Sequence, residues 1–163
     1  MAVSQEKLRE LIFQILMSYD VARSSENELV DRLVKEHGVS KEAVIEAHEE
    51  VKRIALILPE LDEMISAAAK IHNSDRVQTL DRNILRLGIY ELFFDKATPL
   101  NVVISESTRL AHQFGTPSSA IFVTTILDTL YKASKGQPVD VPSASTEKLL
   151  DARYKNDPNA KKP

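Results

Sequence analysis

The chain has 163 residues, no cysteine, 43% hydrophobic and 28% charged residues, and a formal net charge of −3. This composition suits one globular domain with a tail, excludes disulfides and thiolate metal sites, and argues against binding to nucleic acid through a general basic field. Because no apolar run is long enough to span a bilayer and the start lacks a signal-peptide pattern, we expect a cytoplasmic protein.

The first predicted helix begins near Ser4. Its apolar residues recur at the spacing of one helix face: Leu8, Leu11, Ile12, Ile15, Leu16 and Tyr19. Lys7, Arg9 and Glu10 lie outside this stripe. We therefore expect a helix with one buried face and a polar face that carries these charges.

Three more helices are expected before residue 79. Ser25 and Glu28 form a capping-box pattern that opens the second helix, and Gly38 is typical of its end. Ser40 is expected to cap the third helix, whose inward face includes His48. A fourth helix is predicted from Pro59 to about residue 71, followed by a polar connector over residues 72–78.

The segment 79–95, TLDRNILRLGIYELFFD, is apolar nearly all round and predicts a buried central helix. A sixth helix is expected with Thr98 as its cap, Pro99 as its first residue and an end at Gly115. The seventh begins at Thr116–Pro117 and ends before residue 136. Residues 1–135 thus predict an all-α domain of about seven helices, and residues 136–163 a mostly disordered tail in which 147–154 is a candidate short helix.

The sequence offers little catalytic chemistry. It has no Gly-rich phosphate loop, no nucleophile elbow and no paired metal-ligand motif, and its four histidines are scattered over separate helices. We therefore expect no enzymatic activity, no metal and no cofactor.

Four sequence blocks carry a resemblance to a known family: DRNILRLGIYEL, PLNVVISE, LAHQFG and FVTTILD, within residues 79–131. In order and spacing they resemble the NusB family of transcription antitermination factors. The resemblance implies two small helical bundles packed across each other and a non-enzymatic function. It implies binding to NusE, a small-subunit ribosomal protein, and to boxA RNA in ribosomal RNA transcripts, in an assembly of RNA polymerase with other Nus factors that suppresses termination. The same fold forms part of some rRNA methyltransferases, but no catalytic domain follows the match here.

The resemblance also implies an RNA site. The family's first helix usually carries an arginine-rich run, which is reduced here to Lys7 and Arg9; the alternative is a solvated helix face. The start of the last helix carries Ser118 and Phe122, and the family's FVNG motif places its phenylalanine at Phe122 and links it to RNA, where a ring could stack on a base. The alternative is that Phe122 packs on the first helix. Ser118 and Ile121 replace an acidic residue and a lysine that are frequent in the family.

The strongest blocks also contain three charged residues, Arg86, Glu91 and Glu106. Because an unpaired buried charge is very costly, we predict a structural ion pair between Arg86 and Glu106 or Glu91 that joins the fifth and sixth helices.

Two functions remain open. The first is an antitermination factor that binds NusE and boxA RNA. The second is a helical protein–protein module with the same fold that has lost most specific RNA binding. Residues 1–133 carry 15 Lys/Arg against 20 Asp/Glu, which favours a basic protein partner. Either a monomer or a homodimer is compatible with the sequence.

Overall fold

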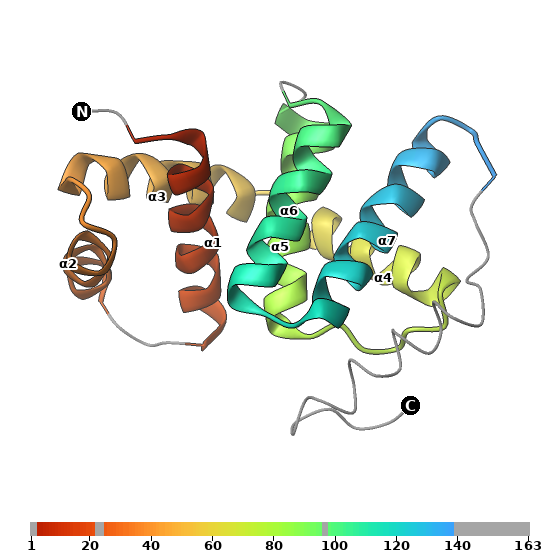
Figure 1. Cartoon of the computed structure of the whole chain (residues 1–163), viewed down its shortest axis with the longest axis horizontal. Helices are drawn as coiled ribbons and strands as arrows, with labels where there is room; N and C mark the ends of the chain where they lie inside the picture. The colour runs from red at the N-terminus through yellow and green to blue at the C-terminus, as the bar shows by residue number, and fades with distance from the viewer. Residues whose placement is uncertain (1–2, 22–24, 96–97, 139–163) are drawn as a thin grey trace. The chain divides into compact units, whose positions relative to one another are not determined.

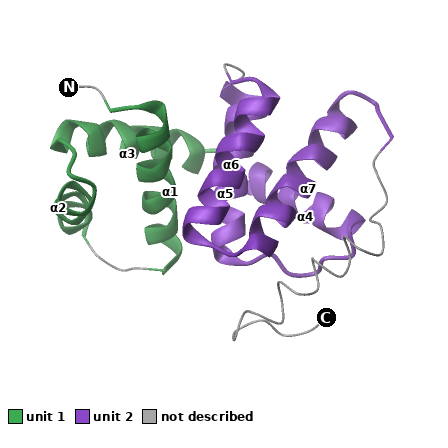
Figure 2. Ribbon diagram, viewed as in Figure 1, with its two compact units in different colours: residues 1–58 green, residues 59–163 purple. Residues whose placement is uncertain are grey.

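The computed structural model describes residues 3–21, 25–95 and 98–138. These residues are helical or lie in short connections, and the chain divides into two compact units, residues 1–58 and 59–163 (Figure 2). Over the described ranges, no helix combines the length and the apolar character needed to cross a bilayer. The predicted all-α fold is confirmed. The predicted tail lies outside the described residues from residue 139 onward, as does the candidate short helix at 147–154.

The first unit contains α1 (Gln5–Val21), α2 (Glu26–His37) and α3 (Lys41–Ala55), and α3 packs against both other helices (Figure 1). The side chain of Ser25 accepts the N–H of Glu28, and the Glu28 carboxylate accepts the N–H of Ser25, so the predicted capping box is present. Gly38 ends α2 in the left-handed conformation with φ 61°. Ser40 caps α3, as predicted.

A polar network joins the three helices of this unit. The hydroxyl of Tyr19 on α1 hydrogen-bonds Nε2 of His48 on α3, and Nδ1 of His48 lies 3.0 Å from the carboxylate of Glu26 on α2. An imidazole that donates its Nδ1–H to the carboxylate has Nε2 free to accept the tyrosine O–H. The network therefore gives both ring nitrogens of the buried His48 a partner, whereas Tyr19, predicted on the buried face of the first helix, is 52% exposed.

The second unit contains α4 (Leu58–Ile71), α5 (Thr79–Ile89), the π-helical segment η1 (Tyr90–Asp95), α6 (Leu100–Phe114) and α7 (Pro117–Ser134). The prediction of one helix over residues 79–95 is wrong at its end, because η1 replaces the α-helix from Tyr90 and widens the turn. The start of α6 is also one residue later than predicted. Pro99 is the N-cap, with ψ 151°, and its carbonyl accepts the N–H of Val103.

The core of the second unit is built around α5, which packs against α6 and α7 (Figure 1). Ile84, Leu85, Leu87 and Ile89 are buried, which confirms the predicted buried helix. A Cβ on Gly88 would lie 3.0 Å from Oγ of Ser107 on α6 and 3.3 Å from a methyl group of Leu127 on α7. Gly88 therefore permits a helix spacing that a larger residue would oppose.

A buried hydrogen bond connects the end of α4 with α7. Nε2 of His72 lies 2.6 Å from Oγ1 of Thr129, and both residues are buried. Nδ1 of His72 is also buried and has no hydrogen-bond partner among the residues that the structure describes. Burial lowers the pKa of His72 below its ordinary value, although the charge of Asp128 opposes the shift.

This lowered pKa predicts a loss of stability in acid. The unfolded chain binds a proton at His72 near pH 6.5, whereas the folded chain binds it only at lower pH, so the free energy of unfolding should fall as pH drops below about 6.5. Burial also lowers the pKa of His37, which acts in the same direction. We expect His72→Gln to weaken the pH dependence of urea unfolding between about pH 7.5 and 5.5. The matched control is His112→Gln at an exposed position. An equal pH dependence in both variants would contradict this role of His72.

Candidate nucleic-acid interface

Lys7 lies in the first turn of α1, where its charge is already compensated. Oγ of Ser4 caps the helix by accepting the N–H of Lys7 at 3.1 Å. Nζ of Lys7 lies 3.0 Å from Oε2 of Glu10, and the lysine side chain is 34% exposed. The same oxygen of Glu10 lies 4.0 Å from Nδ1 of His37. A phosphate could reach Lys7, but it would have to compete with Glu10.

Arg9 is buried, with 9% of its surface exposed. The alternative of a solvated helix face is therefore wrong for Arg9. A guanidinium at the surface would be available to a phosphate, whereas a buried one contacts RNA only if the surrounding side chains move. Its predicted RNA contact remains a prediction.

The start of α7 is capped by its own hydroxyl groups. Oγ1 of Thr116 accepts the N–H of Ser119 at 3.2 Å and lies 3.0 Å from Oγ of Ser118. Pro117, the first residue of the helix, has no N–H, and the N–H of Ala120 reaches the Thr116 carbonyl at 3.3 Å. These bonds leave few of the N–H groups that attract anions at a helix start. Ser118 itself is buried.

Phe122 has no exposed surface. A ring without exposed surface offers no face for a base to stack on, so this burial favours packing inside the protein over base stacking. The contact of Phe122 with the first helix stays a prediction. Thr124 and Thr125 donate their hydroxyls to the carbonyls of Ala120 and Ile121 at 2.8 and 2.7 Å. Both hydroxyls thus bond within α7, and that of Thr124 also lies 3.1 Å from Oγ1 of Thr108 on α6.

The four predicted RNA-binding residues divide between the two units. Lys7 and Arg9 belong to the first unit, and Ser118 and Phe122 lie one helical turn apart in the second. A single surface that contains all four stays a prediction. Over residues 3–21, 25–95 and 98–138, no three His, Asp or Glu side chains form a group that could hold a metal ion.

Arg86 has an acidic partner that the sequence analysis did not identify. Its Nε and Nη2 donate to the two carboxylate oxygens of Asp62 on α4, each at 2.8 Å, and Nη1 donates to Oδ1 of Asn83 at 2.9 Å. This bidentate pair joins α5 to α4. Asp62 follows the buried Leu61 and precedes Ile65 by three residues, so a carboxylate within the apolar spacing of α4 was the available signal.

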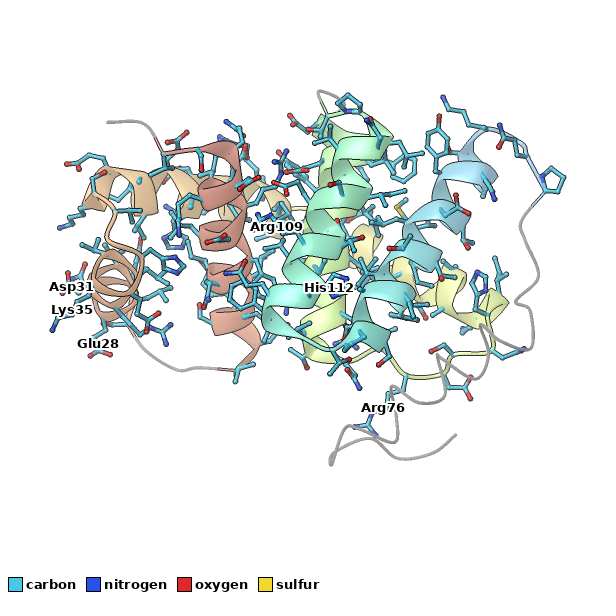
Figure 3. All side chains as sticks on the ribbon, viewed as in Figure 1. Glu28, Asp31, Lys35, Arg76, Arg109 and His112 are labelled. Carbon is cyan, nitrogen blue, oxygen red and sulfur yellow. The ribbon has the colours of Figure 1, made fainter. Side chains whose placement is uncertain are left out.

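Glu106 is also buried and lies 2.7 Å from Nε of Arg109, whose Nη1 donates to Gln113 at 3.2 Å. Figure 3 shows Arg109 on α6, the helix that also carries His112. The predicted pairing of Arg86 with Glu106 or Glu91 stays a prediction beside the pair that Arg86 makes with Asp62.

Residues 6–132 match the model of the NusB family. The chain is 34% identical over 125 residues to the transcription antitermination protein NusB of Desulforudis audaxviator, covering 77% of this chain and 91% of that protein. It is 32% identical over 130 residues to NusB of Chlamydia pneumoniae, covering 80% and 81%. The crystal structure of the antitermination factors NusB and NusE in complex with double-stranded RNA contains a similar chain, with a TM-score of 0.66, 28% identity and coverage of 79% and 96%.

The pair between Arg86 and Asp62 predicts a specific loss of stability. Asp62→Ala leaves a largely buried guanidinium without these two bonds, and we expect it to lower the free energy of unfolding by about 1.5–3 kcal/mol. Glu49→Ala is the matched control, because Glu49 pairs with Lys52 while both side chains are more than half exposed, and it should cost less than about 0.5 kcal/mol. Urea unfolding measures both. Equal losses would refute a structural role for the Asp62 pair.

Proposed function

Because the chain belongs to the NusB family, whose members are non-enzymatic transcription antitermination factors, we propose that it binds NusE and boxA RNA in ribosomal RNA transcripts and suppresses termination by RNA polymerase. The observation that carries this proposal is the match of residues 6–132 to the NusB family. A solved structure that contains NusB, NusE and double-stranded RNA, and a chain similar to this one, supports it. Such a role places the protein in the cytoplasm, in an assembly with RNA polymerase and other Nus factors.

The protein partner provides the first contact in this proposal. Residues 1–133 carry an excess of acidic over basic residues, and opposite charge speeds the encounter with a basic partner. RNA would then meet a surface that is already partly built from NusE. This order suits a chain in which Lys7 is paired with Glu10 and Arg9 is buried.

On the RNA side, Lys7 is the predicted phosphate contact, made by exchanging the carboxylate of Glu10 for a phosphate oxygen. Phe122, which is buried within α7 one turn after Ser118, supports RNA binding in this proposal by stabilising the helix that carries Ser118. Phe122 then contributes to RNA binding without touching the RNA.

The same observations support the second candidate, a protein–protein module that binds NusE but has lost most specific RNA affinity. Charge compensation at Lys7 and the hydroxyls engaged within α7 both reduce the groups that face RNA. The two candidates differ in whether the complex with NusE binds boxA RNA more tightly than an unrelated RNA of equal length.

We expect Lys7→Ala to weaken boxA binding by the complex and to reduce the slope of log affinity against log salt by about 0.7–1, because one phosphate contact is lost. Fluorescence anisotropy titrations with and without NusE, at several salt concentrations, measure both quantities. Lys52→Ala, at an exposed lysine that pairs with Glu49, is the control and should change neither. A complex that prefers no RNA sequence would overturn the first candidate and support the second.

The substitution Phe122→Leu distinguishes a Phe122 ring that packs inside the protein from one that stacks on an RNA base. Leucine keeps an apolar side chain in the buried site, so we expect a loss of no more than about 1.5 kcal/mol of stability and an RNA affinity within about twofold of the unchanged protein. A ring that stacks on a base contributes about 1–3 kcal/mol, so its removal would weaken RNA binding by about fivefold or more. Affinity loss on that scale in a folded Phe122→Leu complex would contradict the packing role.

A further inference from the structure

A groove of about 400 Å³ lies where the end of α7 meets η1. It is lined by Leu92, Phe93, Tyr131, Ser134 and Lys135. The ammonium group of Lys135 lies 5.6 Å from the centre of the Tyr131 ring, a cation–π distance. The groove thus combines apolar and aromatic walls with one cation, within a single unit of the chain.

The π-helical turn of η1 contributes to this surface. Leu92 and Phe93 are only partly buried, and the next residue, Phe94, is 44% exposed. Three successive large apolar side chains thus keep part of their surface exposed at the end of η1. Such a concave surface with apolar walls and few polar groups is suited to an apolar side chain of a partner segment.

The chain itself supplies a segment within reach. α7 ends at Ser134, the described residues end at Pro138, and the chain continues to Pro163. Eight residues separate Pro138 from Glu147, and they span at most about 30 Å when extended. A tether of this length gives an effective concentration of about 1 mM, so even weak docking would be populated.

Residues 147–154 have a sequence pattern suited to docking one helix face in the groove. Glu147, Leu150, Asp151 and Tyr154 recur at i, i+3, i+4 and i+7, the spacing of one helix face. Two of these residues are apolar and two are acidic. The apolar pair suits the walls formed by Phe93 and Tyr131, and the acidic pair suits the cation of the exposed Lys135.

We propose that residues 147–154 dock in the groove between η1 and the end of α7 of the same chain, with Leu150 and Tyr154 against its aromatic wall. The groove is then filled by a segment of the same chain that follows α7. This inference concerns the second unit alone and does not depend on RNA or NusE.

The absence of cysteine makes a direct test possible in the full chain. Ser134→Cys places a thiol in the groove, and Thr146→Cys places a second thiol immediately before the docking segment. We expect the two thiols to form an intramolecular disulfide in a glutathione redox buffer. Adding Leu150→Asp, which puts a charge on the docking face, should lower the rate about tenfold.

Ala152→Asp is the matched control, because it introduces the same charge at a position that would lie opposite Leu150 on a helix of residues 147–154. It should leave the rate within about twofold of the parent. Equal rates in the Leu150→Asp and Ala152→Asp chains would show that tethering alone brings the thiols together and would overturn the proposal. Disulfides that form mainly between chains, at a rate that rises with protein concentration, would also overturn it, because a second copy would then be the occupant.

Discussion

The packing of the second unit depends on burying α5 together with the guanidinium of Arg86, which lies on that helix. Burial of Ile84, Leu85, Leu87 and Ile89 provides the hydrophobic stabilisation, but Arg86 on the same helix brings a charge that is costly to desolvate. Asp62 and Asn83 satisfy that charge with three hydrogen bonds. The pair therefore selects which side of α5 faces α4. With that side occupied, α6 and α7 cover other parts of the helix, where Gly88 permits their close approach.

Most helix boundaries follow from the sequence because they are set by neighbouring residues. A serine cap, a glutamate three residues later or a left-handed glycine acts within one turn, and Ser25, Gly38, Ser40 and Thr116 all behave as predicted. Partners brought together from separate helices do not follow in this way. Thr129 is 57 residues from His72, and Asp62 is 24 residues from Arg86. The sequence indicates that an inward polar group needs a partner, but the partner's identity depends on how the helices pack.

The candidate RNA site shows the same limit. Sequence resemblance identifies which positions correspond to a family's RNA contacts, but exposure is a property of the packed chain. Arg9 and Phe122 are both buried, and Lys7 is held by Glu10. Thr124 and Thr125 donate their hydroxyls to carbonyls four residues earlier in the same helix. This chain therefore retains the fold while satisfying internally several groups that a nucleic-acid surface would leave free.

The small number of cations on the candidate site limits how strongly this chain can bind RNA phosphates. Each phosphate contact on a single strand contributes a slope of about −0.7 to log affinity against log salt, so one lysine changes affinity only about threefold between 50 and 200 mM salt. Lys7 alone thus cannot produce the steep salt dependence of a nucleic-acid complex with many phosphate contacts. Residues 1–133 carry 15 Lys/Arg against 20 Asp/Glu, so a basic protein partner would add positive charge that the net charge of this chain does not provide. Joint recognition by this chain and a basic partner is accordingly the form of RNA binding that these charges favour.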